Sequence, residues 1–160
     1  MNSKEPHSLA PTHKNAWIAL FVASKFLVKK VDRSLEDAGE IALELYEVLL
    51  LLEEAPDQRL RMCDLAERTL LSRSGMTRLV DRLERKGYIK RHASETDRRS
   101  LFAVITSEGL RAREAAWEVF RKAIDHEFAS ALTVPEARTL IKVLGRFVPD
   151  DMRIGWESEG

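Results

Sequence analysis

Residues 72–87 predict a single amphipathic helix with a defined start and end. Ser72 is a good N-cap, because its hydroxyl can accept a hydrogen bond from a backbone N–H of the first helical turn, and Gly87 suits the left-handed conformation that often follows a helix. Between them, apolar side chains recur three and four residues apart, so they form one stripe that must be buried against other elements. The helix should run from about Arg73 to Lys86. The stripe consists of Met76, Leu79, Val80 and Leu83.

The other face of this helix is strongly polar. Arginine can donate paired hydrogen bonds to guanine or hold phosphates, and serine and threonine hydroxyls can reach bases or backbone oxygens of DNA. An ordinary surface helix with a solvated charged face would show the same pattern, so the helix alone does not establish a function. The outward-facing residues are Arg73, Ser74, Thr77, Arg78, Asp81, Arg82 and Arg85.

The neighbouring segments favour recognition of duplex DNA. Residues 61–68 predict a short helix, and residues 69–72 form a connection of helix-turn-helix length. After the second helix, strand-like runs at 88–93 and 101–105 enclose a polar segment, which predicts a β-hairpin with a charged tip. In this arrangement the second helix can enter the major groove, and adjacent arginines at the hairpin tip suit the minor groove. The tip carries Asp97, Arg98 and Arg99.

Segments 61–68, 72–87 and 97–109 resemble the MarR family of bacterial transcription regulators, and the resemblance extends from the first helix to about Phe147. It implies a homodimeric winged helix-turn-helix protein that binds pseudo-palindromic operator DNA and usually responds to a small ligand or an oxidant. By the same resemblance, the recognition helix and the wing tip would supply the DNA contacts. These are Arg73, Ser74, Thr77, Arg78 and Arg82 on the helix, and Asp97, Arg98 and Arg99 on the wing.

Cys63 departs from the pattern of the resembled family, which often has serine or threonine at the start of this helix. Cysteine is a poor cap, so we expect the start of the helix to be held less firmly. Peroxide-sensing members of the family carry their reactive cysteine in the first helix, and residues 12–37 contain none. Cys63 is therefore expected to be structural rather than a redox switch.

Charge is distributed unevenly along the chain. The 160 residues contain 26 basic and 26 acidic side chains, and a formal charge of zero would by itself argue against nucleic acid. Between Arg59 and Arg99, however, 12 Lys and Arg residues stand against six Asp and Glu residues. That segment is positive and the remainder is equally negative, which predicts a basic DNA-binding lobe on an acidic body.

The outer segments predict helices over about 12–37, 43–54, 107–131 and 134–147, and their apolar faces have no further sequence to cover them. A second copy of the chain, in a homodimer, is the simplest way to bury these apolar faces, although a monomeric three-helix bundle is the alternative. The expected fold is mostly α with a small β-wing: a winged helix-turn-helix lobe plus a helical dimerisation lobe built from both chain ends. The expected divisions are a flexible arm (1–11), a dimerisation helix (12–38), the DNA-binding lobe (39–106), C-terminal dimerisation helices (107–148) and a tail (149–160).

The sequence does not name an effector. In the resembled family, effectors are often aromatic or phenolic and lie between the dimerisation helices and the DNA-binding lobe. Four residues could line such a crevice here, although aromatic side chains at helical spacing more often belong to a core. They are Trp17, Phe21, Lys25 and Tyr46.

Other classes of function have little support. No catalytic triad pattern or glycine-rich phosphate loop is visible, so we expect no enzyme and no cofactor. The four histidines lack metal-ligand spacing, and the single cysteine cannot form an intramolecular disulfide. With no signal peptide or membrane-spanning run, a cytoplasmic protein is expected. The competing hypothesis is a winged-helix module that binds proteins instead of DNA; steep salt dependence of duplex binding would distinguish the two.

Overall fold

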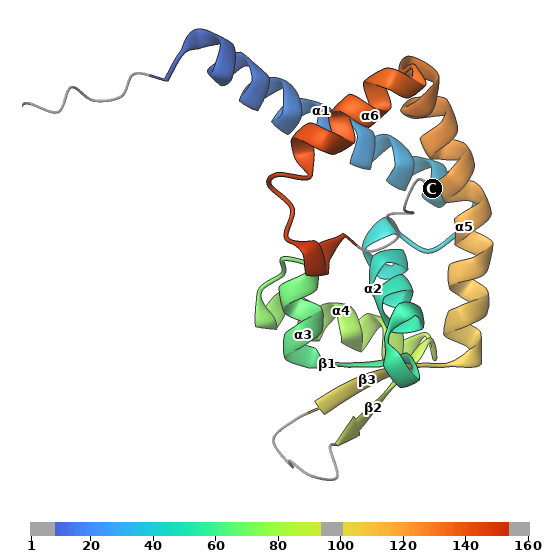
Figure 1. Ribbon diagram of the computed structural model, residues 1–160. Helices are drawn as coiled ribbons and strands as arrows, with labels where there is room; N and C mark the ends of the chain where they lie inside the picture. Colours follow the sequence, from blue (N-terminus) through green and yellow to red (C-terminus); the bar gives the residue numbers. More distant parts are fainter. Residues whose placement is uncertain (1–8, 94–100, 154–160) are drawn as a thin grey trace, which may run out of the picture.

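The computed structural model describes residues 9–93 and 101–153. The described elements are helices packed around a small antiparallel sheet, which confirms the expected mostly α class with a β-wing (Figure 1). The helices are α1 (Pro11–Asp37), α2 (Leu43–Glu54), α3 (Met62–Arg68), α4 (Arg73–Arg85), α5 (Ser107–Glu127) and α6 (Val134–Leu144). The strands are β1 (Arg59–Arg61), β2 (Ile89–Ala93) and β3 (Leu101–Ile105), and the short 3-10 turns are η1 (Pro56–Gln58), η2 (Ala129–Ala131) and η3 (Asp150–Met152).

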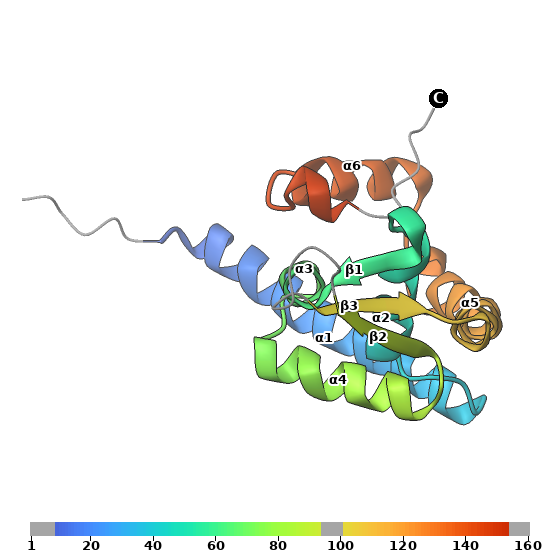
Figure 2. The same ribbon diagram turned by 90° about the horizontal axis from the view of Figure 1, so that it is seen from below.

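The elements gather in two regions. Helices α3 and α4 and the sheet lie together at the lower end of Figure 1, whereas α1 and α6 lie at the upper end and α5 runs between the two ends. The view from below shows α4 on one side of the sheet and α5 beyond the start of the hairpin (Figure 2). Helix α2 lies in the middle and packs against α1, α5 and the sheet. This arrangement places α1 and α6, from the two ends of the sequence, in the same region, while the chain after α6 returns so that η3 lies beside α3 (Figure 1).

The sheet has three strands in the order β1-β3-β2, one more than the two-stranded wing predicted from the sequence. Strand β1 pairs with β3 and places Leu60 opposite Ala103, while β2 places Ile89 opposite Ile105. All four of these side chains are buried. Sequence patterning missed β1 because a strand of three residues is too short to show a period-two alternation.

The core is continuous from α2 through α3 and α4 to the sheet. The predicted apolar stripe of α4 is fully confirmed, since all four of its side chains are buried. Helix α2 buries six of its 12 residues, as expected for a helix that is apolar on nearly every side. The largest fully buried side chains are Leu35, Leu45, Leu49, Leu52, Leu65, Met76 and Leu83.

Local signals set several helix ends correctly. The Ser72 hydroxyl accepts from the Gly75 N–H at 3.1 Å, which confirms the predicted N-cap, and Gly87 has a φ of +75°. Two predicted details of helix ends are wrong. Helix α5 ends at Glu127 rather than near 131, because Phe128 leaves the helical conformation. At the start of α3, the N-cap residue is Arg61 rather than Cys63. Cys63 is exposed, with Sγ 3.3 Å from Asp64 Oδ1.

The junction between β3 and α5 is tightly packed. Thr106 donates its hydroxyl hydrogen to Gly87 O at 2.7 Å and accepts from the Gly109 N–H at 3.1 Å, so it caps α5 and ties it to the end of α4. A Cβ on Gly109 would lie 2.2 Å from the Tyr88 carbonyl oxygen and 2.8 Å from Ile105 Cγ1. This close approach of backbone to backbone requires glycine.

Arg91 joins the base of the wing to α4. Its guanidinium forms ion pairs with Asp81 and with Glu84, the latter at 3.3 Å, and only a quarter of its side chain is exposed. A planar guanidinium can serve two carboxylates at once, which a lysine ammonium does with less directional control. Arg91 therefore helps to set the orientation of β2 against the predicted recognition helix.

Gly109→Ala should destabilise the protein by about 1–3 kcal/mol, because the added methyl group overlaps a backbone oxygen that cannot move independently. Chemical denaturation would measure the loss. Ala115→Ser, at an exposed position of the same helix, is the control and should change the free energy of unfolding by less than about 0.5 kcal/mol. Equal stabilities of the two variants would contradict the packing described for this junction.

Arg91→Ala should lower the free energy of unfolding by about 1 kcal/mol, because it removes two ion pairs that are only partly screened by solvent. The neighbouring Lys90 is exposed and has no ion pair in the part of the chain that the structure describes, so Lys90→Ala is the matched control. Urea denaturation of both variants checks the difference. If the two substitutions cost the same, Arg91 does not anchor the wing.

Candidate nucleic-acid interface

The outward face of α4 gathers four of the predicted DNA-contacting residues. Arg73, Ser74, Thr77 and Arg78 are all exposed, and they occupy the first half of the helix. The Thr77 hydroxyl donates to Arg73 O at 2.9 Å, and the Ser74 and Ser72 hydroxyls lie 3.2 Å apart. This end of α4 thus presents small hydroxyl side chains flanked by two guanidinium groups.

Ion pairing separates the arginines of α4 into two groups. Among the residues that the structure describes, Arg73 and Arg78 have no carboxylate partner. Arg82, by contrast, pairs with Glu44 of α2, and Arg85 donates from Nε to Asp81 O at 3.2 Å. Arg82 is therefore directed to the body of the protein in this structure, while Arg73 and Arg78 remain available to an external anion.

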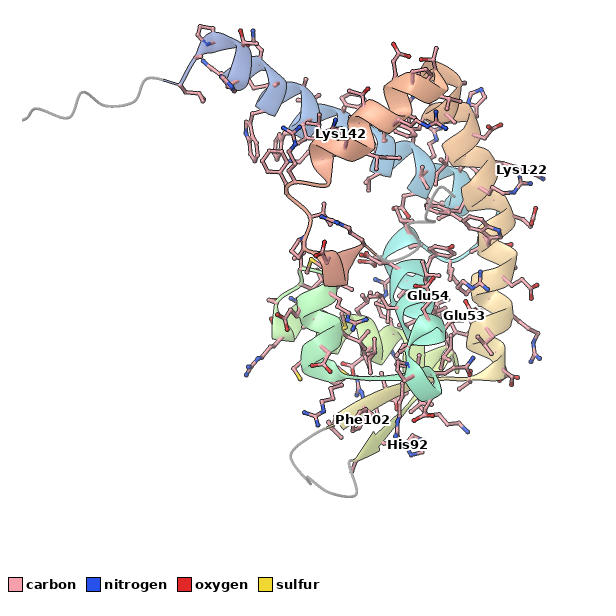
Figure 3. The ribbon with its side chains drawn as sticks, viewed as in Figure 1. Glu53, Glu54, His92, Phe102, Lys122 and Lys142 are labelled. Atoms are coloured by element: carbon pink, nitrogen blue, oxygen red, sulfur yellow. The ribbon has the colours of Figure 1, made fainter. Side chains whose placement is uncertain are left out.

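The predicted wing-tip residues Asp97, Arg98 and Arg99 lie outside the described residues. The strands that lead to them are described, and the sheet carries additional cations near the hairpin. Arg59 and Arg61 of β1 lie over the ring of Phe102, with their guanidinium carbons 5.3 and 5.8 Å from the ring centroid. Figure 3 shows Phe102 and His92 at this end of the molecule. Sequence patterning left Arg59 outside any element and placed Arg61 at the start of the short helix predicted over 61–68, whereas both residues belong to β1.

A separate pocket of about 870 Å³ lies between the second half of α1, α2 and α5. Only Tyr46 of the four predicted effector residues lines it. Trp17, Phe21 and Lys25 lie instead on the exposed first half of α1, where the Trp17 and Phe21 ring centroids are 6.4 Å apart and Lys25 Nζ lies 4.2 Å from the Phe21 centroid. Within one chain, the four residues therefore do not form a single site.

The pocket is lined mainly by apolar and aromatic side chains, several of which sequence reasoning missed. The Tyr46 and Phe120 rings are 4.9 Å apart, and Trp117 lies 5.9 Å from Phe120. Helical spacing puts Trp117 and Phe120 on one side of α5, but spacing alone cannot indicate that this side meets α2. The full lining is Leu27, Val28, Val31, Leu43, Tyr46, Glu47, Leu50, Glu54, Arg113, Trp117, Phe120, Ile124, Glu127 and Phe128.

Charged groups surround the aromatic part of this pocket. Arg113 Nη2 donates to Glu53 Oε1 at 2.8 Å, and both side chains are mostly buried. Burial raises the pKa of the Tyr46 hydroxyl, an effect that the nearby Arg113 opposes, and desolvation raises the pKa of Glu47. Figure 3 shows Glu53 and Glu54 on α2, while Lys122 points outward from α5.

Residues 9–93 and 101–153 contain no group of three or more His, Cys, Asp or Glu side chains placed to hold a metal ion. Over the same ranges, the helices are too short or too polar to cross a membrane.

Comparisons with known proteins match this geometry. Residues 46–100, which include α4 and the hairpin tip, match the model of the MarR family. The HTH-type transcriptional regulator SarZ of Staphylococcus aureus (strain MRSA252) is 30% identical over 135 residues, which span 84% of this chain and 87% of SarZ.

Two solved structures share the fold over nearly the whole chain. AbsC, a MarR family transcriptional regulator from Streptomyces coelicolor, is 28% identical, with a TM-score of 0.79 over 89% of this chain and 95% of AbsC. Sco3205, a MarR family regulator from the same organism solved in complex with DNA, is 26% identical, with a TM-score of 0.82 over 96% of this chain and 99% of Sco3205. Because the likeness to SarZ covers most of both proteins, this chain belongs to the MarR family of transcriptional regulators.

Proposed function

We propose that this protein is a homodimeric transcriptional repressor that binds a pseudo-palindromic operator and is released by a small-molecule effector. The observation that carries the DNA-binding part is the exposed first half of α4, where Arg73 and Arg78 lie beside the hydroxyls of Ser74 and Thr77 and have no carboxylate partner within residues 9–93 and 101–153. Guanidinium groups on the exposed face of a helix suit guanine edges and phosphates. The structural relative Sco3205 was itself solved with DNA, which supports this assignment.

The wing is the second part of the proposed DNA contact. Arg98 and Arg99 would enter the minor groove or hold phosphates, with Asp97 orienting one guanidinium group. Arg82 belongs to the proposed contact set only if DNA binding draws it away from Glu44. The side chains of this pair are both about half exposed, so exchange of partners would cost little.

Unpartnered apolar surface supports the homodimer. Helix α1 exposes Trp17 and Phe26 by 66% and 63%, and Phe147 just after α6 is 77% exposed. Helix α6 buries none of its residues against the rest of the described chain. Burying such large side chains in an interface is favourable, and a two-fold dimer would present two copies of α4 to one DNA duplex.

The effector would occupy the pocket between α1, α2 and α5. It lies beside α2, whose Glu44 holds Arg82 of the proposed recognition helix, so a ligand that displaced α2 would also disturb α4. A small molecule in the pocket would therefore change the position of the proposed DNA-binding face through one helix. The alternative, a winged-helix module that binds proteins, predicts instead that duplex binding is weak and insensitive to its sequence.

Arg78→Ala should weaken operator binding by about 1–3 kcal/mol if Arg78 makes a paired contact with a base, and the loss should be larger on operator than on random duplex. Fluorescence anisotropy with operator selected from genomic fragments would measure it. Arg121→Ala removes the same charge from an exposed position in the second half of α5, away from α4, and serves as the control. Equal weakening on both duplexes would make Arg78 a phosphate contact, and no change would exclude it from the interface.

The salt dependence of parent binding tests the DNA-binding proposal as a whole. A protein that binds duplex DNA should lose affinity for it steeply with added salt, because each phosphate contact releases counterions. Binding to a protein partner that does not change with salt, together with no operator binding, would favour the alternative.

Ile141→Glu combined with Phe147→Glu should dissociate the dimer, because both exposed side chains would place a charge in an apolar interface. Sedimentation equilibrium should show twice the 18.3 kDa chain mass for the parent and a single chain for the variant. Leu101→Glu, at an exposed position on β3, controls for the added charge and should leave the dimer intact. A monomeric parent would contradict the proposal.

A further inference from the structure

The α1–α2–α5 pocket has an unusual balance of charged groups. Its only lining arginine, Arg113, is already paired with Glu53, and its carboxylate Glu127 pairs with Lys30. Two other lining carboxylates, Glu47 and Glu54, have no ion-pair partner among the residues that the structure describes. Lys122, a neighbouring cation on α5, points away from the body (Figure 3). The pocket therefore offers uncompensated negative charge and no free positive charge.

An aromatic wall stands beside these carboxylates. The rings of Tyr46, Phe120 and Trp117 follow one another at centroid separations of 4.9 and 5.9 Å. The faces of such rings attract organic cations, and the attraction grows when the cation is desolvated. Apolar side chains from α1 form the opposite side of this open pocket, and the volume of about 870 Å³ lies within the range of pockets that hold drug-sized molecules.

An anionic aromatic ligand would meet two obstacles in this pocket. It would have to displace Glu53 from Arg113, leaving a mostly buried carboxylate without its partner, or it would have to lie near Glu47 and Glu54 and be repelled by them. A cationic aromatic ligand meets neither obstacle. Its charge can lie near the two free carboxylates while its rings contact the aromatic wall.

We propose that the pocket lined by Tyr46, Trp117 and Phe120 binds lipophilic organic cations more tightly than aromatic anions. The carboxylates of Glu47 and Glu54 determine this preference for positive charge. The proposal rests on the proposed function in one respect only, which is that ligand in this pocket acts as the effector. The selection of a cation stands on the pocket itself and can be measured without DNA.

Tetraphenylphosphonium and tetraphenylborate provide a direct test, because they have nearly the same shape and opposite charge. Isothermal titration calorimetry of the full chain should show one tetraphenylphosphonium bound per chain, at least tenfold more tightly than tetraphenylborate. Trp117→Ala should weaken binding of the cation as well, since it removes part of the aromatic wall. Equal or tighter binding of tetraphenylborate would overturn the proposal.

The double variant Glu47→Gln/Glu54→Gln should bind tetraphenylphosphonium at least tenfold more weakly and should lose most of the preference for the cation. The matched control, Glu36→Gln/Glu114→Gln, removes two exposed carboxylates that do not line the pocket and should behave as the parent. Circular dichroism would verify that both variants fold. If the two double variants bind the cation equally, Glu47 and Glu54 do not select charge and the proposal is wrong.

Operator binding is then measured separately in the presence of tetraphenylphosphonium. Release of operator by the parent at concentrations that fill the pocket, without release of the Glu47→Gln/Glu54→Gln variant, would support both the cation site and its regulatory role. Calorimetric binding without release would uphold the cation site and overturn the proposed effector role of this pocket. Failure of the parent to bind any operator would overturn the proposed function while leaving the calorimetric result intact.

Discussion

Helix α2 presents apolar side chains on nearly every side, so it is stable only when other elements surround it. Leu45, Leu49 and Leu52 are almost completely buried, and each contributes roughly 1.5–3 kcal/mol by leaving water. The elements that cover α2 come from both parts of the molecule: α1 and α5 on one side, and β1 and β3 on the other. Burial of this one helix thus holds the DNA-binding elements and the chain ends in a common structure.

The same helix also carries polar residues at positions where its surface is not covered. Glu44 reaches Arg82 on α4, whereas Tyr46, Glu47 and Glu54 line the pocket against α5. A helix that is packed on several sides moves as a rigid unit, because protein interiors are close-packed and transmit displacement. The pocket and α4, the proposed recognition helix, are therefore connected through a single element, without a long chain of intervening contacts.

Partner carboxylates give the arginines of this protein different roles. Arg91 and Arg113 each hold acidic side chains from a different element, so they act in the architecture. Arg73 and Arg78 are exposed and have no such partner in the part of the chain that the structure describes. All four side chains have the same chemistry. A count of basic residues between Arg59 and Arg99 therefore does not distinguish Arg91 from Arg73 and Arg78. A structural arginine differs from a candidate DNA contact because it forms an ion pair with a carboxylate from another element of the fold.

Local chemistry made much of this fold predictable. Caps at Ser72 and Thr106, the left-handed glycine at Gly87 and the apolar stripe of α4 act over a few residues, so the sequence alone identified the helix-turn-helix and the helix that begins at 107. The same local patterns supported the family resemblance, which the comparisons confirm. Strand β1 escaped prediction because three residues carry too little periodicity, and its pairing depends on β3, more than 40 residues away.

The pocket and the pairing of charges were decided by tertiary structure. Spacing on α1 grouped Trp17, Phe21 and Lys25 with Tyr46, but the packing of α1 against α5 leaves the first three outside the pocket and brings Trp117 and Phe120 to its wall. Likewise, the sequence does not distinguish Arg82 from the other arginines of α4, whereas in the structure it pairs with Glu44 of α2. Sequence by itself determined most of the helices, the β-hairpin and the family resemblance, because those depend on short-range patterns. Only the tertiary structure determined which charges are neutralised and which faces enclose a cavity, because both depend on contacts between residues far apart in the chain.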